Sequence, residues 1–202
     1  MVVILNGAPS SGKSSIVRSM QDLAPGPWLA MGPDRFVPML PARYVDLEGT
    51  GSPEGRAGLH WHRDAASGAT TIRLEPGPLG ARWLEAARVA TAAVARLGHD
   101  VLVEDIVTSV DGWRAWAAAL QGIPTLTVAI RCPLDVLERR EAARADRQAG
   151  HALGVHRLVL DSLECDFEVD TTHASPEECA AAILSCIEYG PPPAALARLP
   201  AR

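Results

Sequence analysis

The sequence predicts a single-domain α/β fold in which helices flank a mostly parallel sheet. Short apolar runs of β type alternate along the chain with helical patterns, which is typical of parallel strands joined by crossover helices. The first run leads directly into a glycine-rich loop of the phosphate-binding type. At 202 residues, the chain is long enough for one core of ordinary size. These observations predict a P-loop NTPase or kinase fold over residues 1–189.

Five short apolar runs are expected to form the sheet. They are residues 2–5, 28–31, 101–105, 125–130 and 167–170. In open α/β sheets, ligands collect at the carboxyl ends of the strands. We therefore expect the functional residues to follow these runs.

Helices are expected between the strands. They cover residues 14–23, 83–97 and 113–120, an arginine-rich segment from Asp135, and a C-terminal segment from Ser175. In the last helix, Ser175 is placed as the N-cap, with proline at the first helical position and Glu178 at the third. Residues 190–202 contain three consecutive prolines and are expected to be a poorly ordered tail.

Residues 41–80 are rich in glycine and proline, and their periodicity is weak. A hairpin is expected around Ser67-Gly68, with residues 59–62 and 70–74 as its two arms. We interpret this region as an insertion into the predicted kinase domain.

The glycine-rich loop matches the pattern G-x-x-x-x-G-K-[ST] at every fixed position. Its lysine, Lys13, is the one lysine among 19 basic residues. The backbone N–H groups of such a loop face phosphates, the lysine reaches the β- and γ-phosphates, and the hydroxyl of Ser14 would bind Mg²⁺. The sequence thus predicts a site for ATP and Mg²⁺. The expected nucleotide-binding residues here are Gly7, Ala8, Pro9, Ser10, Ser11, Gly12, Lys13, Ser14 and Ser15.

Three carboxylates follow predicted strands. Asp34 comes after the second strand and suits a base that accepts the proton of an acceptor hydroxyl. Its alternative role is a helix N-cap. Asp105 or Glu104 suits the metal side of the site, and we assign Asp105 to the metal together with Ser14; the alternative for Asp105 is a solvated strand end.

Four arginines fall within nine residues, at positions 139, 140, 144 and 147. Arg140, Arg144 and Arg147 share one helix face, where a triphosphate would compensate their charge. The alternative is an ordinary solvated helix with ion pairs to neighbouring acids. With the phosphate loop present, we predict a lid over the nucleotide at residues 135–150.

Bulk properties limit the partners. The formal net charge of −5 argues against a nucleic-acid partner, and no apolar run has the length of a membrane span. The four cysteines form no C-x-x-C pair. We expect them to be small, buried side chains that stay reduced, as in a reducing compartment. A soluble, cytoplasmic protein is expected.

The chain resembles the chloramphenicol phosphotransferase family, small P-loop kinases that phosphorylate a hydroxyl of the antibiotic. The matching residues are 4–7, 12–14, 27–30, 32–34, 131–132, 140, 144, 146, 147, 149–150 and 169–173. The resemblance implies an ATP- and Mg²⁺-dependent O-phosphotransferase, and places Thr172 near the nucleotide base. The catalytic residues that it implies are Asp34, Lys13, Arg140, Arg144 and Arg147.

The sequence also departs from that family. Residues 48–80, where an acceptor pocket would be built, are longer than expected and dissimilar, and Glu104-Asp105 stands where paired aspartates are expected. The small-molecule acceptor therefore stays open: chloramphenicol, another natural product, a metabolite or a nucleotide sugar. A non-catalytic nucleotide-sensing module is the alternative from outside the enzymes.

Overall fold

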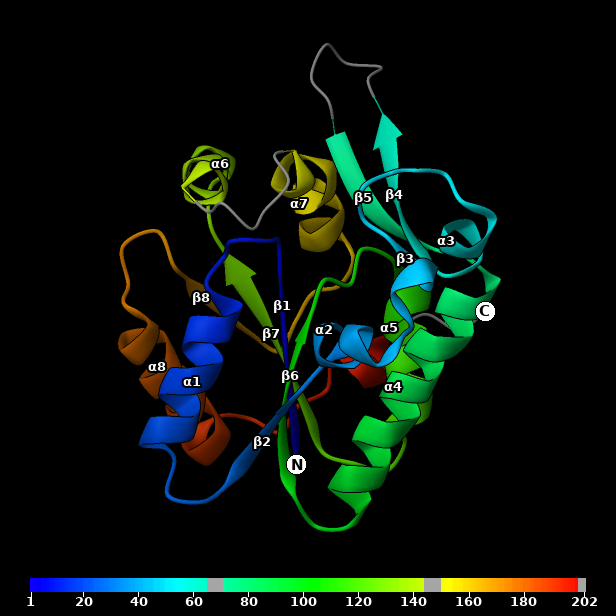
Figure 1. Ribbon diagram of the computed structural model, residues 1–202. Helices are drawn as coiled ribbons and strands as arrows, with labels where there is room; N and C mark the ends of the chain where they lie inside the picture. The colour runs from blue at the N-terminus through cyan, green and yellow to red at the C-terminus, as the bar shows by residue number, and fades with distance from the viewer. Residues whose placement is uncertain (65–70, 144–149, 200–202) are drawn as a thin grey trace.

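The computed structural model describes residues 1–64, 71–143 and 150–199, and Figure 1 shows a layered α/β architecture. A five-stranded sheet has the order β2-β6-β1-β7-β8, and every neighbouring pair in it is parallel. Its strands are β1 (Val2–Gly7), β2 (Trp28–Met31), β6 (Asp100–Asp105), β7 (Thr125–Arg131) and β8 (Phe167–Asp170). The α/β fold class is confirmed.

Eight α-helices and three short 3₁₀ segments are found in the described part of the chain. The α-helices are α1 (Lys13–Leu23), α2 (Pro33–Phe36), α3 (Pro53–Ala57), α4 (Pro78–Arg96), α5 (Val110–Ala119), α6 (Leu134–Ala142), α7 (His151–Asp161) and α8 (Pro176–Tyr189). The 3₁₀ segments are η1 (Val37–Met39), η2 (Ala42–Tyr44) and η3 (Leu196–Arg198). The predicted capping box at Ser175 and Glu178 is present at the start of α8.

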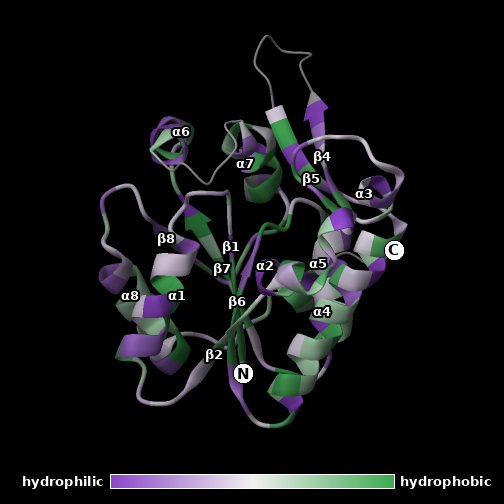
Figure 2. Cartoon of the chain, in the orientation of Figure 1, coloured by the Kyte–Doolittle hydropathy of each residue, from purple (hydrophilic) through white to green (hydrophobic). Residues whose placement is uncertain are grey.

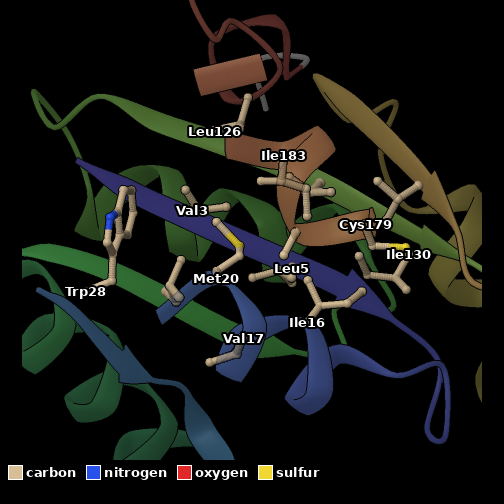
Figure 3. Packing of buried hydrophobic residues seen from close by; sticks show 14 residues of the cluster. Val3, Leu5, Ile16, Val17, Met20, Trp28, Leu126, Ile130, Cys179 and Ile183 are labelled. Carbon is tan, nitrogen blue, oxygen red and sulfur yellow. The ribbon is translucent and has the colours of Figure 1, made fainter. Parts of the chain in front are cut away.

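Two hydrophobic clusters cover the two faces of the main sheet. On one face, α1 and α8 pack on alternate strand residues, such as Val3 and Leu5 (Figure 3). On the other face, Val2 and Ile4 pack with residues of α4 and α5, including Trp113. Each of these large side chains is fully buried, which contributes about 1.5–3 kcal/mol per side chain. A strand that is covered on both faces is expected to be apolar, and Figure 2 shows that β7 is hydrophobic along most of its length.

The register aligns the carboxyl ends of the central strands. Leu5 and Asn6 of β1 pair with Glu104 and Asp105 of β6, and Gly7 pairs with Ile130 of β7. The loop after β1 and the carboxylates at the end of β6 therefore lie at the same edge of the sheet.

A second, smaller sheet lies beyond that edge. It consists of β3 (Val45–Asp46), β4 (Leu59–Asp64) and β5 (Thr71–Pro76). β4 and β5 are antiparallel, as expected for the arms of a hairpin, and β3 adds to β4 in parallel. The turn predicted at Ser67-Gly68 lies outside the described residues. In Figure 1, β5 is next to α7.

The prediction of a poorly ordered C-terminal tail was wrong for residues 190–199. Ala195 is buried, and the N–H groups of Ala194 and Ala195 each donate to Asp166 Oδ1 at 2.7 Å. Leu196 and Leu199 pack against the cluster that contains Trp116. A buried acceptor and an apolar face thus hold the segment in place.

Among the described helices, none is long and apolar enough to cross a membrane.

Candidate active site

The phosphate loop joins β1 to α1 with the backbone that such a loop requires. Gly12 has φ 92°, and Ser10 also adopts a positive φ, 62°, which is uncommon for a residue with a side chain. A Cβ at Gly7 would lie 2.7 Å from Ser11 Oγ and 2.9 Å from Ile130 Cβ, so only glycine fits there. The N–H groups of Ser15 and Ile16 donate to Gly12 O and begin α1.

The polar side chains of this loop suit an anionic ligand. Lys13 Nζ donates to Gly7 O at 2.7 Å and Ala8 O at 2.9 Å, which places its ammonium against the loop. Ser10 Oγ and Ser11 Oγ are buried without a hydrogen-bond partner in the described structure. Such hydroxyls are costly unless something satisfies them. Phosphate oxygens beside the positive end of α1 would do so.

Glu104 is the carboxylate that meets the phosphate loop. Ser14 Oγ donates to Glu104 Oε2 at 2.5 Å, and Arg35 Nη2 lies 3.4 Å from Glu104 Oε1. Alternation along β6 explains this position, because Leu102 belongs to the cluster on the α1 face and Glu104 is two residues further on. Ser14 and Glu104 together present oxygens of the kind that Mg²⁺ prefers.

Asp105 faces the opposite side of the sheet. Its Oδ2 accepts from Trp116 Nε1 at 2.7 Å, and its Oδ1 accepts from the N–H of Ile106 at 2.7 Å. Burial raises the pKa of this carboxyl, and the charge of Asp34 raises it further, while the two hydrogen bonds and Arg88 oppose the shift. Asp105 is thus neither a solvated strand end nor a neighbour of Ser14 in this structure. The geometry favours Glu104 over the predicted Asp105 on the metal side.

Asp34 lies in the first turn of α2, directly after β2. Gly32 allows the chain to pass close to the backbone of Glu104. Its φ is 136°, and a Cβ there would lie 2.4 Å from Glu104 O. Gly32 is also the N-cap of α2, so Asp34 does not cap this helix. The Asp34 side chain is exposed, and its charge acts on the carboxyl of Asp105. α2 therefore holds Asp34 beside the end of β6.

Arg140 connects α6 to the phosphate loop. Its Nη2 donates to Thr171 O at 2.7 Å and its Nη1 donates to Thr171 Oγ1 at 3.3 Å. Thr171 Oγ1 in turn donates to Ser11 O at 3.0 Å. Arg139, by contrast, forms an exposed pair with Asp135 at 3.4 Å, as an ordinary solvated helix would. Arg144 and Arg147, the other predicted lid arginines, lie outside the described residues.

A hollow of about 380 Å³ opens beside the phosphate loop. It is lined by Ser10, Gly12, Ser15, Ile16, Arg140, Ala143, Thr171, Ala174 and Pro176. Thr171, which the sequence analysis missed, reaches this hollow. The predicted Thr172 instead donates from its N–H and its hydroxyl to Asp170 Oδ1, which lowers the pKa of the Asp170 carboxyl. Adjacent threonines in one turn have no sequence signal that separates them.

The second sheet and its neighbours bring aromatic side chains together. The rings of Trp61 on β4 and His151 on α7 meet edge to face, with centroids 4.7 Å apart. Phe36 and Trp83 form a similar pair between α2 and α4, at 6.2 Å. Trp61 Nε1 is buried and has no hydrogen-bond partner in the described structure.

Comparison with known proteins extends these observations. A model of the family described as "Chloramphenicol phosphotransferase-like protein" matches residues 1–188. Two proteins of Mycobacterium tuberculosis, each named for O-phosphotransferase activity, are 29% identical over 205 residues, covering 98% of this chain and 87% of the relative.

Solved structures share the fold at low identity. A sugar kinase from Janibacter has a TM-score of 0.63 at 17% identity, covering 94% of this chain and 95% of its own. The APS kinase CysC of Mycobacterium tuberculosis, solved with AMPPNP and APS, has a TM-score of 0.60 at 18% identity, with 93% and 96% covered. The tunicamycin resistance protein of Deinococcus radiodurans has a TM-score of 0.60 at 15% identity, with 92% and 94% covered. The chain therefore belongs to the chloramphenicol phosphotransferase-like protein family, and it is a kinase-type phosphotransferase with a P-loop kinase fold.

Proposed function

We propose that this protein transfers the γ-phosphoryl group of ATP to a hydroxyl group of a small molecule. The observation that carries the proposal is the contact between Ser14 of the phosphate loop and Glu104 at the end of β6, with Asp34 held beside the same strand end. One sheet edge thus combines a phosphate cradle, a metal-side carboxylate and an exposed carboxylate. Phosphoryl transfer to an alcohol needs a metal-bound phosphate held in line with the hydroxyl, and often uses a carboxylate to accept the hydroxyl proton.

The residues of the loop and lid would bind the nucleotide. The unsatisfied hydroxyls of Ser10 and Ser11 and the backbone at the start of α1 suit the phosphates, and the hollow beside Thr171 suits the nucleoside. Lys13 would turn from the loop carbonyls to the β- and γ-phosphates. Ser14 and Glu104 would hold Mg²⁺, directly or through water. When bound, the metal neutralises the charge on the phosphates.

In the transfer step, the acceptor oxygen forms a bond to the γ-phosphorus. The bond from that phosphorus to the β–γ bridging oxygen breaks, and ADP leaves with its electron pair. Asp34 accepts the proton of the acceptor hydroxyl. Arg140 compensates negative charge on the transferring group, as we also propose for Arg144 and Arg147.

The proposed acceptor binds between Asp34 and the second sheet. Family membership makes chloramphenicol the first compound to test, and would link the protein to resistance against it. Residues 48–80 are longer than expected for the chloramphenicol enzyme and dissimilar to it, so a metabolite or nucleotide sugar is the alternative acceptor. The aromatic pairs formed by Trp61 and Trp83 offer apolar walls to a compound of either kind.

Mass spectrometry after incubation with Mg·ATP and a panel of hydroxylated compounds, chloramphenicol included, tests the proposal. We expect one compound to gain the mass of a single phosphate, and we expect the Lys13→Ala variant to form none of it. The exposed Arg18→Ala variant on α1 serves as a matched control and should form product normally. Tight nucleotide binding without any phosphorylated product would instead favour a nucleotide-sensing module.

A further inference from the structure

Glu141 is a buried carboxylate next to the lid arginine. It is 3% exposed, and its two oxygens accept from the N–H groups of Gly150 at 2.9 Å and Ala152 at 3.1 Å. These donors belong to the first turn of α7, where the helix dipole favours negative charge. Arg140, one residue earlier, points to Thr171 instead. α6 thus contacts two different parts of the molecule through adjacent residues.

α7 is in turn bound closely to the second sheet. The N–H of Ile72 on β5 donates to Gly150 O at 3.1 Å. A Cβ at Gly154 would lie 2.4 Å from Ile72 O, so the helix and the strand approach to a distance that only glycine permits. Figure 1 shows α7 between α6 and β5. A shift of α7 would therefore move β5 with it.

A continuous series of contacts joins the phosphate loop to the second sheet. It runs from Ser11 through Thr171 to Arg140 on α6, and from Glu141 through Gly150 to Ile72 on β5. Leu137 of α6 belongs to one buried cluster with Val155 and Val159 of α7 and with Ala8 of the loop, so the joint between the two helices has an apolar core. Glu141 adds two hydrogen bonds to that joint.

We propose that Glu141 is a positioning residue that couples nucleotide binding at the phosphate loop to the conformation of the second sheet, beside which the acceptor is proposed to bind. Glu141 holds α6 and α7 as one unit, so the engagement of Arg140 with the nucleotide site also sets the position of β5. The proposal rests on the proposed function for the presence of a nucleotide at the loop. Because such coupling is reciprocal, an acceptor that orders β5 would also favour the nucleotide-engaged position of Arg140.

Hydrogen–deuterium exchange with and without Mg·AMPPNP tests the coupling in the wild type, Glu141→Gln and Glu138→Gln. In the wild type, the nucleotide analogue should slow exchange both in the loop and at the amide of Ile72, the latter at least about fivefold. Glu141→Gln should keep the protection of the loop and lose that of β5, because its NH₂ group meets a backbone donor where an oxygen stood. Glu138 is exposed on the same helix, so Glu138→Gln should match the wild type.

Equal protection of β5 in Glu141→Gln and the wild type would overturn the inference, as would a wild type protected at the loop alone. A wild type without protection at the loop would refute nucleotide binding itself, and the inference would fall with it. Gly154→Ala tests the same path with Glu141 intact, and covers the case in which Glu141→Gln does not fold. It should retain loop protection and lose the nucleotide effect on Ile72; an unchanged effect there would also overturn the coupling.

Discussion

At the scale of single residues, neighbouring carboxylates on one strand have opposite surroundings. Glu104 faces the phosphate loop and contacts Ser14, whereas Asp105 is half-buried and accepts a hydrogen bond from Trp116. The sequence predicted that one of them serves the metal, since both follow a run of apolar residues. It could not identify which one, because that depends on which sheet face α1 covers. Lys13 and Ser14 were identifiable because their motif defines their positions.

Removing the charge of each carboxylate in turn should separate their roles. We expect Glu104→Gln to raise the Mg²⁺ concentration for half-maximal nucleotide binding by about 10-fold or more, because it loses the carboxylate beside Ser14. Asp105→Asn, the matched control one residue away, should leave that midpoint unchanged. Calorimetric titration of AMPPNP at a series of Mg²⁺ concentrations measures both. The opposite result would return the metal role to Asp105.

Asp105 should also give the protein a recognisable pH dependence. Burial raises the pKa of the Asp105 carboxyl in the folded state above its ordinary value of 3.8, so the folded protein binds this proton more tightly than the unfolded chain does. Its contribution to the free energy of unfolding therefore increases as the pH falls through the folded pKa, and is complete once the pH is below the ordinary aspartate pKa of the unfolded chain, 3.8. The free energy of unfolding of the wild type, relative to that of Asp105→Asn, should therefore rise as the pH falls. Urea unfolding of both proteins from pH 7 to pH 4 checks this, and a constant difference would contradict it.

At the scale of elements, the strands of the main sheet, the cap at Ser175 and the arms of the hairpin were predictable, and the helices around them were predictable only in part. β2 and β8 have the bounds that their apolar runs predict, and Ser175 caps α8 as expected. α3 and α7 were missed: α3 is only five residues long, and it lies in a segment rich in glycine and proline. α7 is an 11-residue helix, and N–H groups at its start donate to the side chain of Glu141, which belongs to a different helix, α6. Such tertiary contacts leave no local signal.

The turn from β2 into α2 should tolerate no side chain at Gly32. We expect Gly32→Ala to lower the free energy of unfolding by about 2 kcal/mol or more, because a Cβ would strike the backbone of Glu104 and the φ of 136° is strained for alanine. Gly26→Ala is the matched control, since a Cβ there meets nothing within 4 Å. Chemical denaturation compares the two variants. Equal stabilities would mean that α2 is not held against β6 as described.

At the scale of the whole molecule, the C-terminal segment completes the core beside α5. Composition alone suggested a poorly ordered tail, because three prolines follow Gly190. The buried carboxylate of Asp166, only 8% exposed, overrides that local tendency by accepting from Ala194 and Ala195. It also accepts from the N–H and the hydroxyl of Thr127 on β7. The tail is thus joined to the main sheet through one side chain.

Asp166→Ala should therefore loosen the tail and destabilise the protein. Loss of a buried acceptor shared by several donors is expected to cost about 2–4 kcal/mol in the free energy of unfolding. Limited proteolysis should then cut within residues 190–199, which the wild type protects. Glu164→Ala, an exposed change two residues away, should affect neither measurement. A wild type cut as rapidly as the variant would show that the tail is not held by Asp166.

In the proposed reaction, Asp34 removes the proton from an acceptor hydroxyl while the phosphate loop presents ATP. Phosphoryl transfer by the wild type and by Asp34→Asn, measured by mass spectrometry with the acceptor found in the panel, tests it most directly. Asp22→Asn, an exposed change on α1, is the control. We predict that Asp34→Asn binds AMPPNP within about twofold of the wild type. We also predict that it forms product at least about 100-fold more slowly than the wild type. Product formation at the wild-type rate would contradict the assignment of Asp34 as the base.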